Sequence, residues 1–154
     1  VLNSKDLGED LNNITIPKFI FLFLTLNIVI LEREFKALTK LLSKLANTKL
    51  DGVIVQDLGM LYILKKHFPT LDVHASTQLT THNRGQIPFL KKLGVSRVNL
   101  SRELNLKEIS ALTTVAQEQD ILTEVFVHGS LCIAFSGLCY STYKKFNIFN
   151  QGGA

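Results

Sequence analysis

The residues with the clearest chemical capacity lie towards the C-terminal end, in the segment EVFVHGSLCIAFSGLC. This segment contains His128 and the chain's two cysteines, Cys132 and Cys139, with six residues between them. Zinc-binding cysteine pairs usually have about two to four intervening residues, so the spacing alone does not indicate zinc. An imidazolium at His128 would lower the pKa of the Cys132 thiol and prepare a nucleophile, although no orienting third residue can be placed. The spacing leaves three interpretations open: metal or redox ligands, a nucleophile, or two small buried apolar side chains.

Polar side chains form a second group, because they recur directly after short apolar segments. They are Asn27, Gln56, Asp57, His74, Ser76, Gln78, His82, Asn83, Arg102, Glu103 and His128. If the apolar segments are parallel strands, these side chains converge on one edge of the sheet, as a binding or catalytic pocket requires.

Several members of this group have a structural alternative. Asp57 and Ser76 stand where a helix begins, and either could cap the free amides of its first turn. His74 alternates with apolar neighbours and could be a hydrogen-bonded core histidine. Arg102 and Glu103 could simply pair with each other, although their position directly after a buried strand favours the pocket.

The elements that position these residues follow from periodicity. Apolar segments at 19–25, 52–55, 71–75, 95–100 and 121–127 predict buried strands, and amphipathic segments at 32–45, 58–67, 81–93 and 105–115 predict helices. Asn105, followed three residues later by Glu108, has the spacing of a capping box. Five strand–helix units in series indicate parallel strands with right-handed crossovers, so the fold class is α/β.

The number of units limits the architecture. A complete (β/α)8 barrel needs eight units and typically about 250 residues, whereas this chain has 154 residues. The chain is therefore either an open doubly wound sheet or an incomplete section, about five units, of a (β/α)8 TIM-type barrel. Both architectures place a site at the carboxyl ends of the strands. We divide the chain into a lead-in at 1–17, a partial barrel domain at 18–140 and a divergent or truncated tail at 141–154.

Composition and charge limit the possible location and partners of the protein. The most apolar run, residues 19–31, is shorter than the roughly 20 residues that span a bilayer, and the first residues lack the layout of a signal peptide. We therefore expect a cytoplasmic protein with no membrane association. The net charge of +4 comes from dispersed Lys and Arg residues, which permits an RNA partner without requiring one. A small-molecule or peptide substrate is not excluded, and open sheet edges would favour a homo-oligomer or pairing with a missing barrel half.

Residues 124–139 closely resemble the signature of peptidase family U32, the collagenase-like peptidases. The similarity continues through DGVIVQDLG at 51–59, HASTQ at 74–78, THN at 81–83 and GVSRVNLSRELNLKEI at 94–109, and covers the chain from about residue 19 to its end. The resemblance implies a (β/α)8-type barrel, of which this chain looks like the middle portion. It also implies two chemistries: a peptidase or collagenase activity, or oxygen-independent hydroxylation of ribosomal RNA, transfer RNA or ubiquinone precursors.

The resemblance also implies a role for the thiols. In the hydroxylation factors four cysteines hold an iron–sulfur cluster, and the first pair matches Cys132 and Cys139. Ala154 stands where the third cysteine would fall, and the fourth would lie beyond the end of this sequence. The expected cofactor is an iron–sulfur cluster for which two of four ligands are present.

Three functions follow from these observations. A hydroxylation factor for RNA would use Arg102 as an anion contact, and a peptidase would use His128 or Glu103 as a general base. The third possibility is an inactive fragment or accessory binding module. The residues predicted as catalytic are His128, Glu103 and His74. Those predicted to bind substrate are Asn27, Gln56, Asp57, Ser76, Gln78, His82, Asn83 and Arg102.

Overall fold

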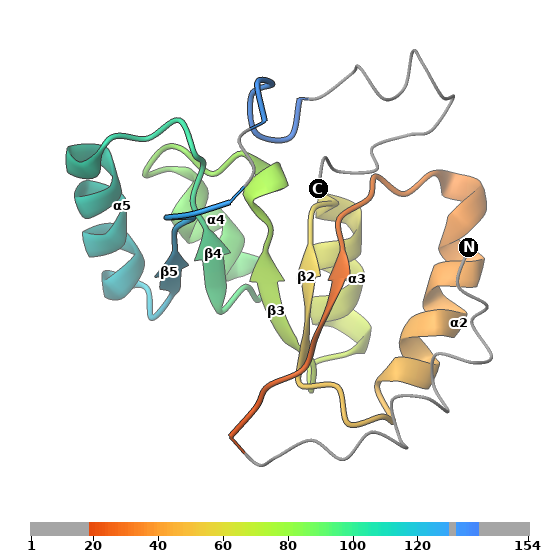
Figure 1. Cartoon of the computed structure of the whole chain (residues 1–154). Coiled ribbons are helices and arrows are strands. Elements are labelled where there is room, and N and C mark those ends of the chain that lie inside the picture. The colour runs from red at the N-terminus through yellow and green to blue at the C-terminus, as the bar shows by residue number, and fades with distance from the viewer. Residues whose placement is uncertain (1–18, 130–131, 139–154) are drawn as a thin grey trace.

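A computed structural model describes residues 19–129 and 132–138 of the chain. Its five strands form one parallel sheet in the order β1-β2-β3-β4-β5 (Figure 1). The strands are β1 (Phe23–Leu26), β2 (Gly52–Val55), β3 (Asp72–Ala75), β4 (Arg97–Asn99) and β5 (Leu122–Glu124). The five-strand α/β prediction is confirmed.

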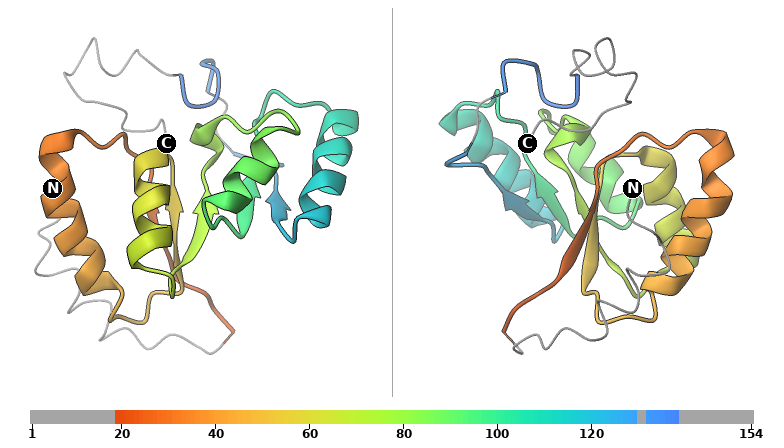
Figure 2. Two further views of the ribbon diagram at one scale, coloured as in Figure 1. Left: turned by 180° about the vertical axis from the view of Figure 1, so that it is seen from behind. Right: turned by 45° about the vertical axis from the view of Figure 1, so that its right-hand side comes forward.

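The helices distinguish between the two predicted architectures. They are α2 (Phe35–Leu45), α3 (Leu58–His67), α4 (Gln86–Lys92) and α5 (Leu106–Glu118), with short 3-10 turns η1 (Glu32–Glu34) and η2 (Thr77–Leu79). All four α-helices lie on the same face of the sheet, as the two views of Figure 2 show. A doubly wound sheet has helices on both faces and a reversal in strand order. The sequential order and the single helical layer are those of a section of a (β/α) barrel.

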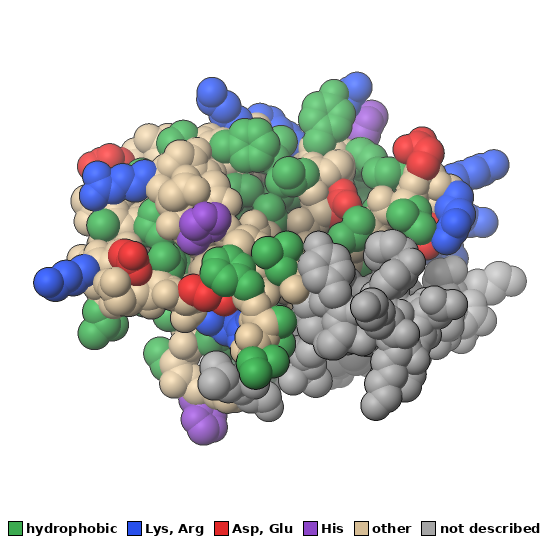
Figure 3. Space-filling model, turned by 90° about the horizontal axis from the view of Figure 1, so that it is seen from above, with side chains coloured by type: hydrophobic (Ala, Val, Ile, Leu, Met, Phe, Trp, Pro, Cys, Tyr) green, Lys and Arg blue, Asp and Glu red, His purple; other side chains and the backbone are tan. Residues whose placement is uncertain are grey.

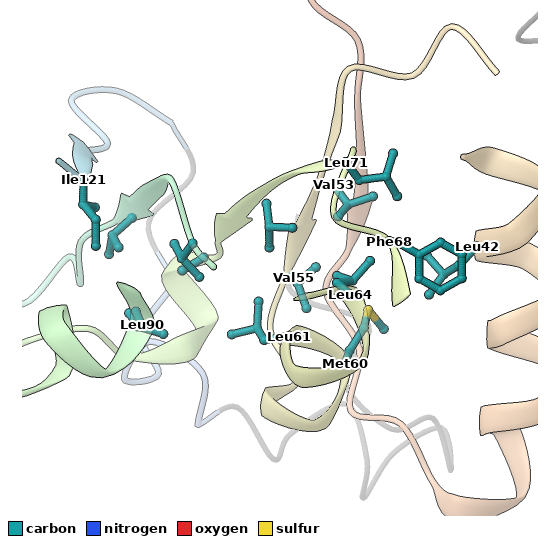
Figure 4. Close-up of a cluster of buried hydrophobic side chains, with 14 of the residues drawn as sticks. Leu42, Val53, Val55, Met60, Leu61, Leu64, Phe68, Leu71, Leu90 and Ile121 are labelled. Carbon is teal, nitrogen blue, oxygen red and sulfur yellow. The ribbon is translucent and has the colours of Figure 1, made fainter. Parts of the chain in front are cut away.

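The carboxyl ends of the strands meet at the upper edge of the sheet in Figure 1, and Figure 3 looks down on this edge. The hydrophobic core lies below it, between the sheet and the helices. Val53, Val55 and Ala75 on the helical face of the sheet are fully buried, and they pack against leucines such as Leu61 and Leu64 of α3 (Figure 4). Alternation along each strand therefore sends the intervening residues to the opposite face, which we call the helix-free face because none of the described helices lies on it.

The first strand is shorter than the sequence predicts. Pairing begins at Phe23, opposite Gly52, and Phe19 and Phe21 are 80% and 71% exposed. The prediction of a buried strand is wrong for these residues. They come before Phe23, the residue that pairs with the first residue of β2, so in the sheet they extend beyond the end of β2 and have no strand residue opposite them. Apolar composition alone does not reveal where the neighbouring strand begins.

The other corrections concern element ends. The predicted helix at 81–93 begins only at Gln86, because Thr80 has a left-handed backbone (φ 57°) and the Gln86 side chain accepts hydrogen bonds from the backbone N–H groups of His82 and Asn83. Strands β4 and β5 are shorter than the apolar segments that predicted them. Helix α5 runs three residues further than predicted, and its Asn105–Glu108 capping box is confirmed.

The predicted lead-in at 1–17 and tail at 141–154 lie outside the described residues, as does Cys139. Within the described ranges, none of the helices has the length and apolar character needed to span a membrane.

Candidate functional site

The loop that carries Cys132 lies against the carboxyl-end edge of the sheet. Residues 132–138 form the blue segment at the top of Figure 1. The side chain of Arg102, in the loop after β4, donates three hydrogen bonds to this segment. They reach the carbonyl of Cys132 (3.4 Å), the carbonyl of Ala134 (3.2 Å) and the hydroxyl of Ser136 (3.3 Å). Arg102 thus holds the backbone at the cysteine itself.

Ser136 is the centre of this contact. Its backbone N–H and its hydroxyl both donate to Oε1 of Glu103, at 2.9 Å and 3.1 Å, and its carbonyl accepts from the Thr80 hydroxyl at 2.8 Å. The side chain is almost fully buried. We call Thr80, Arg102, Glu103 and Ser136 the latch, since together they hold residues 132–138 to the loops after β3 and β4.

Glycine is required beside the latch. Gly137 has φ +78°, and a Cβ built on it would lie 2.2 Å from the backbone oxygen of Gln78. Any other residue would meet both a strained backbone and a backbone clash. Phe135 adds a second contact, because the ring of His82 meets it edge-on at 6.4 Å. The cysteine loop is therefore packed as well as hydrogen-bonded onto this edge.

The latch also sets the ionisation of Glu103. Partial burial of this carboxyl would raise its pKa, but hydrogen bonds from the backbone N–H and hydroxyl of Ser136 and from its own N–H outweigh this effect. Together with the charge of Arg102 they hold the pKa below the ordinary value of 4.5. Glu103 is therefore an ionised acceptor at neutral pH and a weaker base than a carboxyl with a pKa near 7.

Two of the predicted substrate-binding residues serve as helix caps. Oδ1 of Asp57 accepts from the backbone N–H of Met60 at 2.9 Å, and Oδ2 accepts from that of Ile30 at 3.1 Å. The Ser76 hydroxyl accepts from the backbone N–H of Gln78 at the start of η2 (3.2 Å). The side chains of both residues are thus used for local structure, and their role in binding substrate stays a prediction.

His74 lies within the sheet. It is buried on β3, its Nε2 is 2.9 Å from Oδ2 of Asp72, and its ring stacks on Phe23 with centroids 4.3 Å apart. Asp72 also accepts a hydrogen bond from the hydroxyl of Ser96. These contacts match the core-histidine alternative, and the catalytic role of His74 stays a prediction.

A row of polar residues lies where the strands end. Leu26, Val55, Ala75, Val98 and Thr123 are aligned across the sheet. The next residue of each strand is polar, and we call this set the polar level: Asn27, Gln56, Ser76, Asn99 and Glu124. The register continues into it, because Asn99 pairs with Glu124 and the Ser76 N–H donates to the carbonyl of Val55. Sequence reasoning found three of these residues and did not assign Asn99 or Glu124 to a site.

Comparison with known proteins identifies the family. The model of peptidase family U32 matches residues 13–152.

The chain belongs to peptidase family U32.

Its relatives have different names. The chain is 38% identical, over 80% of its length, to the protein named 23S rRNA 5-hydroxycytidine C2501 synthase of Escherichia coli. It is 37% identical, over 84% of its length, to tRNA hydroxylation protein P of Haemophilus influenzae. It spans only 18% and 28% of these two relatives. A solved structure, the U32 peptidase Mk0906, matches 79% of this chain and 49% of its own with a TM-score of 0.58 at 17% identity, which supports the fold.

The remaining predicted residues of this U32 chain are spread along the edge. His82 and Asn83 are exposed in the turn before α4, Gln78 is half-buried in η2, and His128 is exposed after β5. The Nδ1 atom of His82 lies 2.6 Å from the carbonyl of Thr80, next to the latch. His82 is therefore brought close to the cysteine loop, whereas no hydrogen bond or ion pair joins His128 to the latch among the described residues.

The described residues include only part of the ligand set that an iron–sulfur cluster would need. Cys132 is half-buried, and its backbone carbonyl is held by Arg102. In the described ranges, no three His, Cys, Asp or Glu side chains lie close enough to hold a metal ion. These ranges supply a single thiol, so the described residues alone do not form a cluster site.

Sequence reasoning missed two parts of the site. Ser136 gave no signal beyond its place in the segment that resembles the U32 signature. Thr80 gave none, because its contact with Ser136 joins residues 56 positions apart. Both roles depend on how the cysteine loop folds back, which local spacing does not encode.

Proposed function

We propose that this chain is part of an RNA-hydroxylating enzyme of family U32, and that its carboxyl-end edge holds the RNA base that is modified. The observation that carries the proposal is the latch, which fixes the Cys132 loop directly against the loops after β3 and β4. A cofactor bound by this loop would lie beside the edge where (β/α) barrels bind their substrates. The relatives named for rRNA and tRNA hydroxylation support RNA as the substrate class.

The cofactor in this proposal is an iron–sulfur cluster. Cys132 and Cys139 would supply two of its thiolates. Bound there, a cluster provides electron transfer at a potential set by its surroundings. Arg102 and Glu103 then act as positioning residues for Cys132, since their side-chain groups are engaged by the loop.

Charge at the edge is compatible with RNA. Figure 3 shows most Lys and Arg side chains at the periphery of this face, whereas hydrophobic, uncharged and some acidic groups lie further in. Phosphates can be contacted from the periphery while a base enters the centre, in keeping with the general division between backbone contacts and base contacts.

A peptidase is the second candidate, because the structurally similar protein is described as one. The expected bases give it less support. The Glu103 carboxylate accepts both Ser136 bonds and has a lowered pKa, and His74 is buried against Asp72. Among the described residues, the hydrogen bonds of the histidine rings go to the Asp72 carboxylate and the Thr80 backbone carbonyl, and none joins a histidine ring to a serine, threonine or cysteine side chain.

One experiment separates the candidates. The chain is reconstituted anaerobically with iron and sulfide and incubated with RNA from cells that lack hydroxylation proteins. A protein-free small-molecule extract of the same cells supplies the two-electron oxidant and the oxygen-atom donor that hydroxylation of a C–H bond requires, and the nucleosides are then analysed by mass spectrometry. Gelatin and casein hydrolysis are measured on the same samples. We expect a nucleoside that has gained one oxygen atom, lost in Cys132→Ala, with no protein hydrolysis.

Two other results would contradict the proposal. Hydrolysis that survives chelation and Cys132→Ala would favour the peptidase. Loss of both activities, with RNA still bound, would favour an accessory binding module.

A further inference from the structure

The polar level contains oxygen atoms that have no hydrogen-bond partner in the part of the chain that the structure describes. Oδ1 of Asn27, Oε1 of Gln56 and Oδ1 of Asn99 are each enclosed and unpaired. The Gln56 side chain is about nine-tenths buried, with 9% of the residue exposed. Buried polar atoms are almost always paired, and leaving one unpaired is costly to folding. Three such atoms at one level of the sheet are therefore unusual for a purely structural surface.

Their location points to a ligand. Val55, Ala75 and Val98 turn towards the helices, so the polar level, one residue further on, turns to the helix-free face. This level is at the carboxyl ends of the strands, where (β/α) folds bind ligands. The torsion that orients a side-chain amide is broad and roughly two-fold. Rotation about this torsion can present either the amide oxygen or the amide nitrogen to a molecule at this face.

The charge of the level limits the ligand class. Its one charged member, Glu124, is 3.4 Å from Nη1 of Arg97 and also accepts from Nδ2 of Asn99 at 3.4 Å. No lysine belongs to the level. Nε of Arg97, two residues before Asn99 on β4, has no partner among the described residues, but the guanidinium charge is offset by Glu124. An uncharged ligand with N–H and carbonyl groups therefore matches the amides better than a phosphate or carboxylate does.

The spacing between the Asn27 and Gln56 positions narrows the ligand class further. Asn27 and Gln56 follow directly paired residues of neighbouring strands, and neighbouring strands lie about 4.8 Å apart. That separation is close to the width of the hydrogen-bonding edge of a planar heterocycle. Asn and Gln amides are the side chains that pair with base edges through a donor and an acceptor together. Enzymes that modify a base read its extruded edge in this way.

We propose that the polar level is a nucleobase subsite, in which Asn27 and Gln56 pair with the edge of an extruded base and Asn99 completes the pairing. This inference rests on the proposed function, because it assigns the base of the RNA substrate to particular side chains. Gln56 is the most direct test residue, since it is the most deeply buried of the three amides and its oxygen has no hydrogen-bond partner among the described residues.

The experiment measures binding of a short single-stranded RNA with one cytidine, and of the same RNA with an abasic site at that position. The proteins are the unmodified chain, Gln56→Leu and Gln117→Leu. Leucine at position 56 keeps the side-chain bulk and removes an unpaired buried acceptor, so the variant should fold with no fall in Tm. Gln117 is exposed on α5 and serves as the matched control.

We expect the abasic site to weaken binding by the unmodified chain about tenfold, as for loss of one amide–base pair. Gln56→Leu should bind the cytidine RNA about tenfold more weakly and no longer distinguish it from the abasic RNA. Gln117→Leu should behave like the unmodified chain.

Equal binding of both RNAs by all three proteins would overturn the subsite and leave an RNA partner in place. If none of the proteins binds RNA, the RNA partner itself fails, and free cytidine and uridine then decide the subsite by saturation-transfer NMR. Saturation of the base protons that Gln56→Leu abolishes would support the subsite, whereas its absence in the unmodified chain would overturn it.

Discussion

Replacing Glu103 with alanine should release the cysteine loop from the carboxyl-end edge. The Glu103 carboxylate accepts the backbone N–H of Ser136 at 2.9 Å, and Ser136 is only 2% exposed. Without the carboxylate this N–H stays buried and unpaired, which costs about 1–3 kcal/mol. At about 1.4 kcal/mol for each factor of ten, the docked loop becomes about 5- to 140-fold less populated relative to its open form.

Amide hydrogen exchange measures this change directly. The Ser136 amide should exchange about 5- to 140-fold faster in Glu103→Ala than in the unmodified chain. Glu103→Gln retains a side-chain oxygen and should show a smaller increase. Glu118→Ala, at an exposed position on α5, is the control for loss of a carboxylate elsewhere. Identical exchange at Ser136 in Glu103→Ala and the unmodified chain would refute the latch as the element that holds the loop.

Three further outcomes follow from the contacts. Because the latch lowers the pKa of Glu103 below 4.5, the contribution of this carboxylate to loop docking should be full above pH 4.5 and be lost as the pH falls through the lowered pKa. Ser136 protection factors, corrected for intrinsic exchange, that stay constant as the pH falls through this range would argue against this contribution. Gly137→Ala should destabilise the docked loop by about 1–2 kcal/mol or more, since φ is +78° and the new Cβ would lie 2.2 Å from the backbone oxygen of Gln78. Amide hydrogen exchange at residues 132–138 measures this destabilisation, and Gly85→Ala, at a helical backbone position, is the control. Asp57→Ala should lower the free energy of unfolding by about 1–2 kcal/mol through loss of the α3 cap, which urea denaturation measures; an unchanged midpoint would show that the cap contributes little.

The sheet and its helices could be predicted from periodicity because their signals are local. The apolar segment at 52–55 and the capping pair Asn105 and Glu108 appear in the structure as expected. The exposed residues at 19–21 could not be predicted as such, because their burial depends on whether a strand lies beside them. The late start of α4 depended on a left-handed Thr80 and on the Gln86 side chain, neither of which has a strong sequence signature.

The candidate site was predictable in position and less so in detail. Polar residues after each strand were expected to meet at one edge, and the strand register places Asn27, Gln56 and Ser76 at one level. Arg102 and Glu103 were expected to face substrate, but their side chains contact the cysteine loop. That contact spans more than 30 residues of sequence, so it depends on the fold of the loop and not on local pattern.

The most direct test of the account is anaerobic reconstitution with iron and sulfide, followed by the visible spectrum and the iron content. The proteins are the unmodified chain, Cys132→Ala, and Ser43→Ala as a control on the exposed face of α2. The account predicts a brown chromophore with bound iron in the unmodified chain and the control, and its loss in Cys132→Ala. Absence of iron from all three proteins, or equal iron in all three, would contradict a cofactor held by the Cys132 loop at the substrate edge.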